Sequence, residues 1–228
     1  MTRFVILAGG EAKRLRWDTD VPKPCLDLGN GEFLLERQVN WLIGKMVSPK
    51  EIIVALNEKT LDYIEENDLK PVKGLTWFVE KEKLGTSGCA HDLMSKYTDD
   101  LFYVFNCDDI LFGDYNPQSL LDIPISGVAQ LLLGFGRFQF GVVHEVNGYV
   151  TGFEQKPLLK DKKVFIGHIA FNRNALRWLP AQDDFEPIVL PFLARQRLLY
   201  SKLFKGNWLT ISTAKDLDEV RNYLGKKK

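Results

Sequence analysis

Two adjacent glycines and a group of cations near the start of the chain are residue types that suit phosphate binding. Gly9 and Gly10 end the apolar run at residues 4–8, a pattern typical of a short buried strand. Backbone N–H groups in a turn after such a strand can face an anion at close range. The cations that follow are Lys13, Arg14 and Lys23. The pattern favours a ligand with several phosphates, such as a triphosphate.

The sequence Asn106-Cys107-Asp108-Asp109 is a second candidate site, because it directly follows the strongly apolar residues 101–105. Ligands of α/β sheets collect at the carboxyl ends of strands, so we expect these acids to lie near the glycine turn. Mg²⁺ prefers one or two carboxylates together with substrate phosphates. Asp108 is the favoured ligand, since neighbours on an extended chain point to opposite faces. The alternative is that both acids cap the following turn.

Strand and helix patterns alternate along the first half of the chain. Apolar and β-branched runs predict strands at residues 4–8, 51–56, 76–79 and 101–105, and helical spacing predicts helices at 34–46, 60–66 and 87–97. This alternation predicts a parallel α/β sheet covered by helices. Short strands at 128–135, 141–145, 150–153 and 164–171 are expected as antiparallel or mixed additions to the same sheet. Helical patterns return at 188–196 and 214–223.

Length and composition are those of an ordinary globular protein. The 228 residues suit a single domain, with a nucleotide-binding half at about 1–114 and an acceptor-binding half at about 115–228. Lys+Arg 30 balances Asp+Glu 30, so no global field favours nucleic acid or an anionic membrane. No apolar stretch reaches the ~20 residues that cross a bilayer, and no signal peptide is evident. We expect a cytoplasmic protein whose three cysteines are reduced and buried.

Six motifs occur in an order and spacing that resemble those of a known family. They are Leu7-Ala8-Gly9-Gly10 with Arg14-Leu15 and Pro22-Lys23-Pro24, Leu84-Gly85-Thr86-Ser87-Gly88, Asn106-Cys107-Asp108, Gly141-Val142-Val143, Phe153-Glu154-Gln155-Lys156-Pro157 and Trp208-Leu209-Thr210-Ile211-Ser212-Thr213. Together they are similar to the signature motifs of the sugar-nucleotide pyrophosphorylases, which are sugar-1-phosphate nucleotidyltransferases. The resemblance extends over nearly the whole chain.

The resemblance implies both a fold and a reaction. The fold is α/β and Rossmann-like, with a mixed, mainly parallel central sheet and helices on both faces. The reaction joins a nucleoside triphosphate to a sugar 1-phosphate, releases pyrophosphate and forms an NDP-sugar. Such a transfer depends on positioning and on neutralisation of charge, and the resemblance implies Mg²⁺ as the cofactor.

The resemblance also implies roles for residues at matching positions. The residues implied to bind the nucleotide are Leu7, Ala8, Gly9, Gly10, Gly85 and Thr86. Two cations have implied catalytic roles: Arg14 neutralises the leaving pyrophosphate, and Lys23 helps to hold the reacting phosphates. Asp108 is implied to bind Mg²⁺. On the acceptor side, Lys156 is implied to grip the sugar phosphate and Glu186 to meet the sugar.

Four departures from the family pattern bear on whether the chain is active. Ala12 replaces the third glycine of the signature, Trp17 replaces a proline, and Gln155 replaces the acid before the lysine of its motif. Thr210 occupies the place of the family's second metal-binding aspartate and brings no charge. The alternative hypothesis is therefore a catalytically silent homologue that binds a nucleotide or a sugar and serves regulation or assembly.

The resemblance indicates the nucleobase and the oligomeric state less directly than it indicates the reaction. The acidic segment at residues 80–86 is similar to that of guanylyl-transferring members. A carboxylate near the base can accept hydrogen bonds from the N1–H and the amino group of guanine. Guanylyl transfer is therefore favoured, while cytidylyl and thymidylyl transfer stay open. The resemblance is also compatible with a homo-oligomer.

Overall fold

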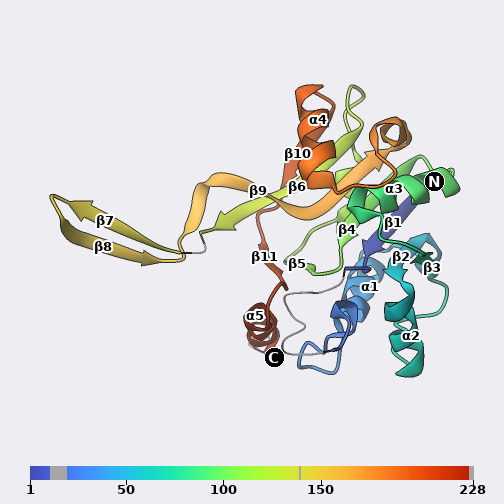
Figure 1. Cartoon of the computed structure of the whole chain (residues 1–228), viewed down its shortest axis with the longest axis horizontal. Coiled ribbons are helices and arrows are strands. Elements are labelled where there is room, and N and C mark those ends of the chain that lie inside the picture. Colours follow the sequence, from blue (N-terminus) through green and yellow to red (C-terminus); the bar gives the residue numbers. More distant parts are fainter. Residues whose placement is uncertain (11–19, 139, 226–228) are drawn as a thin grey trace.

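A seven-stranded sheet forms the centre of the molecule (Figure 1). The computed structural model describes residues 1–10, 20–138 and 140–225. The strands of the sheet, in the order in which they lie side by side, are β10 (Leu199–Leu203), β6 (Ala129–Arg137), β9 (Leu158–Asn172), β4 (Leu101–Asn106), β1 (Thr2–Leu7), β2 (Ile52–Asn57) and β3 (Thr76–Glu80). All four strands predicted in the first half of the chain are confirmed.

The residues of strand β1 are apolar in succession rather than in alternation, and this pattern is typical of a strand in a parallel sheet. Phe4, Val5 and Ile6 are all buried, which is typical of a strand covered on both faces. β1 pairs in parallel with β2 and β4, and β2 pairs in parallel with β3. The carboxyl ends of these four strands therefore meet at one edge. β9 is antiparallel to both β4 and β6, so the sheet is mixed, as predicted.

Helices cover both faces of the sheet. α1 (Leu34–Gly44), α2 (Glu58–Glu66) and α5 (Ala214–Gly225) bury apolar side chains in one core, and α3 (Gly85–Lys96) and α4 (Leu190–Arg195) bury theirs in a second core. A π-helical turn, Phe185–Val189, precedes α4, so helical structure starts earlier than predicted there. Cys25, Cys89 and Cys107 are buried free thiols, as expected. Among the described residues, no helix is both long enough and apolar enough to span a membrane.

Two short strands pair with each other beside the main sheet, and the first of them begins within the acidic motif. β5 (Asp109–Phe112) starts at the second acid and pairs in antiparallel orientation with β11 (Asn207–Thr210). In this register Asp109 lies directly opposite Thr210. The suggestion that both acids cap a turn is therefore wrong for Asp109, whose backbone belongs to a strand.

A two-stranded hairpin projects from the body of the molecule. β7 (Gly141–Val146) and β8 (Tyr149–Gln155) pair only with each other within the part of the chain that the structure describes. They form an arm, residues 141–155, beyond the ends of β6 and β9 (Figure 1). The prediction that these strands extend the central sheet is wrong. Alternation of polar and apolar residues is the same for a sheet strand and for a free hairpin, so the pattern does not distinguish the two.

Candidate functional site

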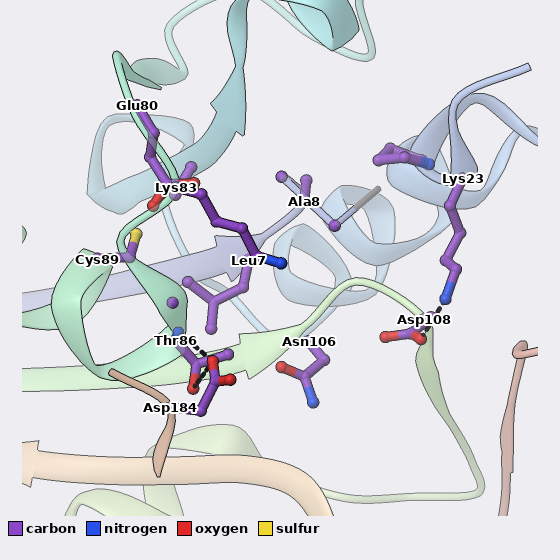
Figure 2. A pocket seen from close by; sticks show the side chains of 15 residues that line it. Leu7, Ala8, Lys23, Glu80, Lys83, Thr86, Cys89, Asn106, Asp108 and Asp184 are labelled. Atoms are coloured by element: carbon purple, nitrogen blue, oxygen red, sulfur yellow. Dashed lines mark hydrogen bonds and ion pairs between the residues drawn. The ribbon is translucent and has the colours of Figure 1, made fainter. Parts of the chain in front are cut away.

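A cavity of about 200 Å³ opens at the sheet edge where the parallel strands end. It brings together eight of the predicted site residues, Leu7, Ala8, Gly9, Gly10, Lys23, Gly85, Thr86 and Asp108. These residues come from the end of β1, the segment before α1, the start of α3 and the loop after β4. Figure 2 shows them around one space, with Lys23 and Asp108 at one end and Thr86 at the other.

The glycine turn after β1 is fixed by hydrogen bonds to strand β2. The Ala8 N–H donates to the Ala55 carbonyl (2.6 Å), and the Asn57 side-chain amide donates to the Gly9 carbonyl (2.9 Å). A Cβ atom at Gly9 would lie only 2.7 Å from Oε2 of Glu80, so the turn and this carboxylate approach each other closely because the residue is glycine. A Cβ atom at Gly10 would have no neighbour within 4 Å among the described residues, and Gly10 lines the cavity.

Lys23 and Asp108 form an ion pair on the wall of the cavity. Lys23 Nζ lies 2.8 Å from Asp108 Oδ2, and the two side chains are only 18% and 24% exposed. The Gln38 side-chain amide of α1 donates to the carbonyls of Cys107 (2.7 Å) and Asp109 (3.0 Å) and so fixes the loop on both sides of Asp108. The site therefore presents a positioned cation beside a positioned carboxylate, a combination suited to phosphate oxygens and a divalent cation.

Asp109 is not among the described residues that line this cavity and belongs to a buried polar cluster behind Asn106, which does line it. Its Oδ2 accepts a hydrogen bond from the Asn106 amide (2.9 Å), and the Thr210 hydroxyl also bonds to its carboxyl group. A Cβ atom at Gly167 of β9, where φ is +74°, would lie 1.7 Å from Asp109 Oδ2. Burial raises the pKa of the Asp109 carboxyl to about 7, with a further contribution from the nearby charge of Asp108. The Thr210 position therefore contacts an acid on the opposite strand.

The start of α3 is held by a segment a hundred residues further along the chain. The N–H of Thr86 donates to Asp184 Oδ1 (2.9 Å), and the N–H of Phe185 donates to Thr86 Oγ1 (2.9 Å). The N–H of Ser87 donates to the Asp183 carbonyl (2.9 Å). Gly85, with φ +78°, leaves no room for a side chain because its Cβ would lie 2.3 Å from that carbonyl. The first N–H groups of α3 are thus satisfied within the protein.

Glu80 and Lys83 bring charge to the cavity from the end of β3 and the loop that follows. In Figure 2 Lys83 extends into the space beside Leu7, and Glu80 lies near Cys89 of α3. Burial raises the pKa of the Glu80 carboxyl, while its hydrogen bond with the Cys89 thiol has the opposite, smaller effect. A second cavity of about 460 Å³ shares Gly9, Gly10, Glu80 and Lys83 with the first, so the glycine turn and these two charges border both spaces.

Two predicted site residues do not line the cavity, and a third lies outside the part of the chain that the structure describes. Arg14 lies outside the described residues, as do the departures Ala12 and Trp17. Lys156 lies between β8 and β9 at the root of the arm, with φ +46°. Glu186 lies exposed in the π-helical turn before α4. Neither Lys156 nor Glu186 is among the described residues that line the cavity.

Sequence reasoning missed Asp184, which lines the cavity and caps α3. No local pattern marks it, because its partners are almost a hundred residues away. It also treated Cys89 only as a core residue, although the thiol borders the same cavity.

The side chains that line the cavity could hold a divalent cation only together with oxygen atoms of a bound ligand. Within the described residues, no group of three His, Cys, Asp or Glu side chains is arranged to hold a metal ion. Asp108 is the carboxylate that lines the cavity near Lys23, and Thr210 adds no charge. This arrangement fits Mg²⁺, which is commonly held by one or two carboxylates plus substrate phosphates.

Comparison with known proteins identifies the class. The model of the Nucleotidyl transferase family matches residues 3–227, and the chain belongs to this family. It is 28% identical over 238 residues to "Probable mannose-1-phosphate guanylyltransferase 1" of Oryza sativa subsp. japonica, covering 97% of this chain and 64% of that protein. It is 27% identical to "Mannose-1-phosphate guanyltransferase" of Candida albicans, covering 93% of this chain and 61% of that protein. The chain thus spans less than two thirds of the length of these relatives.

Solved structures show the same fold at low sequence identity. HddC from Yersinia pseudotuberculosis, complexed with GMP-PN, superposes with a TM-score of 0.72 at 21% identity and covers 98% of this chain and 100% of that one. A putative glucose-1-phosphate thymidylyltransferase from Bacillus anthracis, in complex with a sucrose, gives a TM-score of 0.71 at 17% identity, with coverages of 98% and 95%. The α/β fold with its mixed sheet is therefore that of nucleotidyltransferase structures.

Proposed function

We propose that the chain transfers a nucleotidyl group from a nucleoside triphosphate to a sugar 1-phosphate. The observation that carries this proposal is the arrangement of the cavity. The Lys23–Asp108 ion pair lies at one end and Glu80 and Thr86 lie toward the other (Figure 2), with Gly85 and the glycine turn also lining the space. A nucleotide laid along this space has its phosphates near the ion pair and its base near Glu80.

The reaction needs two bond changes. An oxygen of the sugar phosphate forms a bond to the α-phosphorus, the bond from that phosphorus to the bridging oxygen of the β-phosphate breaks, and pyrophosphate leaves with the electron pair. Lys23 neutralises charge on the phosphates, and the N–H groups of the glycine turn orient them. Arg14 is proposed to act on the leaving pyrophosphate.

Mg²⁺ is proposed as the cofactor, with Asp108 as its protein ligand and phosphate oxygens as the others. When bound, the ion neutralises negative charge on the reacting phosphates. The Lys23 ammonium now paired with Asp108 is then available for a phosphate oxygen, since both carboxylate and phosphate are its natural partners.

Guanine is the proposed base. The Glu80 carboxylate can accept hydrogen bonds from the N1–H and the amino group of guanine, whereas adenine offers an acceptor at N1. The relatives whose printed names specify guanylyl transfer, at 25–28% identity, support the same choice. For the acceptor, Lys156 and Glu186 remain proposed contacts of the sugar phosphate and the sugar. A cytoplasmic setting also remains part of the proposal.

Pyrophosphate release tests the activity. The protein is incubated with Mg²⁺, each of five nucleoside triphosphates and a panel of sugar 1-phosphates. We expect turnover with GTP and at least one sugar 1-phosphate, and its loss in Asp108→Asn, whose fold is checked by circular dichroism. Nucleotide binding without turnover for any pair would refute the enzyme and favour the silent binding homologue.

Base selection is tested with Glu80→Gln. An amide cannot accept both hydrogen bonds from guanine, so we expect the KM for GTP to rise about 10- to 100-fold, since bonds to a charged group contribute ~1.5–3 kcal/mol. The control is Glu66→Gln, an exposed acid of α2. If Glu80→Gln and Glu66→Gln have the same preference for GTP over ATP as the wild type, the base assignment is wrong.

A further inference from the structure

Lys83 is a cation of the cavity to which the reaction described above gives no role. It lies in the loop after β3, three residues beyond Glu80, and both side chains line the same space. Within the part of the chain that the structure describes, Lys83 has no ion-pair partner, whereas Lys23, which also lines the cavity, is paired with Asp108. The Lys83 ammonium group is therefore available to an acceptor atom of a ligand.

The position of Lys83 separates it from the part of the cavity assigned to the phosphates. In Figure 2 its ammonium group lies beside Leu7, in the half of the space that also holds Glu80, while Lys23 and Asp108 lie at the opposite end. A base in this half has the apolar side chain of Leu7 and two opposite charges around it. Few placed polar groups in an otherwise apolar lining are typical of a site that selects its ligand.

The nucleobases differ in the groups that they would present to these two charges. Guanine has two donors, the N1–H and the amino group, next to the acceptor O6, and uracil likewise has an N–H beside a carbonyl oxygen. Adenine and cytosine have an amino group, a donor, where guanine and uracil have that oxygen. An ammonium group can only donate hydrogen bonds and a carboxylate can only accept them. The ammonium group therefore favours a carbonyl at this position and opposes an amino group.

We propose that Lys83 is a specificity-determining residue that donates a hydrogen bond to O6 of guanine while Glu80 accepts from the N1–H and the amino group. The inference rests on the proposed function, from which it takes the placement of the phosphates near Lys23. The two residues have separate tasks in this arrangement. Glu80 distinguishes guanine from bases without the two donors, and Lys83 rejects bases with an amino group in place of the carbonyl. The expected order of affinity is GTP, then ITP and UTP, then ATP and CTP.

Nucleotide affinity, measured by calorimetry with Mg²⁺ and without a sugar 1-phosphate, tests this role. Lys83→Met keeps an unbranched apolar stem but removes the donor, so it should weaken the binding of GTP and of ITP by about 10-fold or more. The binding of ATP should not weaken. Lys83→Arg keeps donors that suit O6 and N7 of guanine, and should retain the preference for GTP. The control Lys81→Met changes an exposed lysine of the same loop that lines only the second cavity, and it should leave all affinities unchanged.

An analogue with one changed atom identifies the contact. In 6-thioguanosine triphosphate a sulfur atom, a weaker acceptor, replaces O6, so Lys83→Met should cost much less affinity with this analogue than with GTP. Equal losses for GTP, ATP and the analogue would place Lys83 on the phosphates and overturn the inference. An unchanged affinity for GTP in Lys83→Met, or a wild-type protein that binds ATP as tightly as GTP, would also overturn it.

The same titrations separate this inference from the proposed function. A wild-type protein that binds no nucleoside triphosphate would refute the proposed function and the role of Lys83 together. A wild-type protein that binds GTP, with equal losses for GTP and ATP in Lys83→Met, would refute the role of Lys83 alone. The catalytically silent homologue would still show the selectivity for GTP, because the measurement requires binding and not turnover.

Discussion

Replacing His168 by glutamine should make the protein less sensitive to acid. The ring of His168 is fully buried in the core, stacked on Phe105 at 4.8 Å, and its Nδ1 shares a hydrogen bond of 2.9 Å with the Tyr103 hydroxyl. Burial lowers the pKa of His168 from 6.5 to about 3, because the charged ring loses its hydration there.

The sign and size of the effect follow from this pKa. Between pH 6.5 and about 3 the unfolded chain binds a proton at His168 and the folded protein does not. The stability that the neutral ring contributes is therefore complete above pH 6.5 and is lost as the pH falls. One pKa unit corresponds to ~1.4 kcal/mol. The free energy of unfolding should thus lose about 2 kcal/mol at pH 5 through this group, and about 4 kcal/mol by pH 3.

Urea unfolding at intervals between pH 4.5 and 8 measures the difference between wild type and His168→Gln. The variant loses ring stacking at every pH, so it should be less stable at pH 8, and its disadvantage should shrink by ~1.4 kcal/mol per unit below pH 6.5. The control is Ile169→Val on the same strand, with a cost of ~0.5–1.5 kcal/mol that does not change with pH. A constant difference between wild type and His168→Gln across this range would refute the reasoning.

Two further substitutions test the site. Gly167→Ala places a Cβ 1.7 Å from Asp109 Oδ2 at a φ of +74°. Thermal unfolding should therefore show that the free energy of unfolding falls by at least ~2 kcal/mol. An unchanged melting temperature would contradict the close approach. Lys23→Gln removes the cation beside Asp108; if the proposed function holds, kcat should fall about 100-fold or more. The exposed control Lys70→Gln should leave kcat unchanged, and equal rates for both variants would remove Lys23 from the catalytic residues.

Much of the cavity lining was predictable because its signals are local. Gly9 and Asp108 each lie two residues beyond the end of a strand, β1 and β4, so they lie at the sheet edge wherever these strands pair in parallel with their neighbours. Gly85 and Thr86 were assigned from a resemblance, and the structure places them as the first residues of α3 rather than as a turn before it. The cavity confirms that these segments lie together.

Other parts of the site depend on contacts that no short pattern encodes. Asp184 borders the cavity because its segment docks on α3, and the pairing of Asp109 with Thr210 results from two strands about a hundred residues apart. The direction of the arm also depends on the tertiary structure. Its strands alternate as sheet strands do, and only the pairing of β6 with β9 sets where they go.

The length of β9 has a practical consequence for engineering. This strand of 15 residues begins at the root of the arm and passes Gly167, which lies against Asp109. Leu158 pairs with Arg137 and Phe165 pairs with Leu133, so between these two pairs the ribbon spans four residues of β6, roughly 13 Å at ~3.3 Å per residue. The hairpin tip at Asn147-Gly148 lies further out still. It is thus a natural position for inserting a peptide tag or an immobilisation handle, because an insertion there is separated from the cavity by the full ribbon.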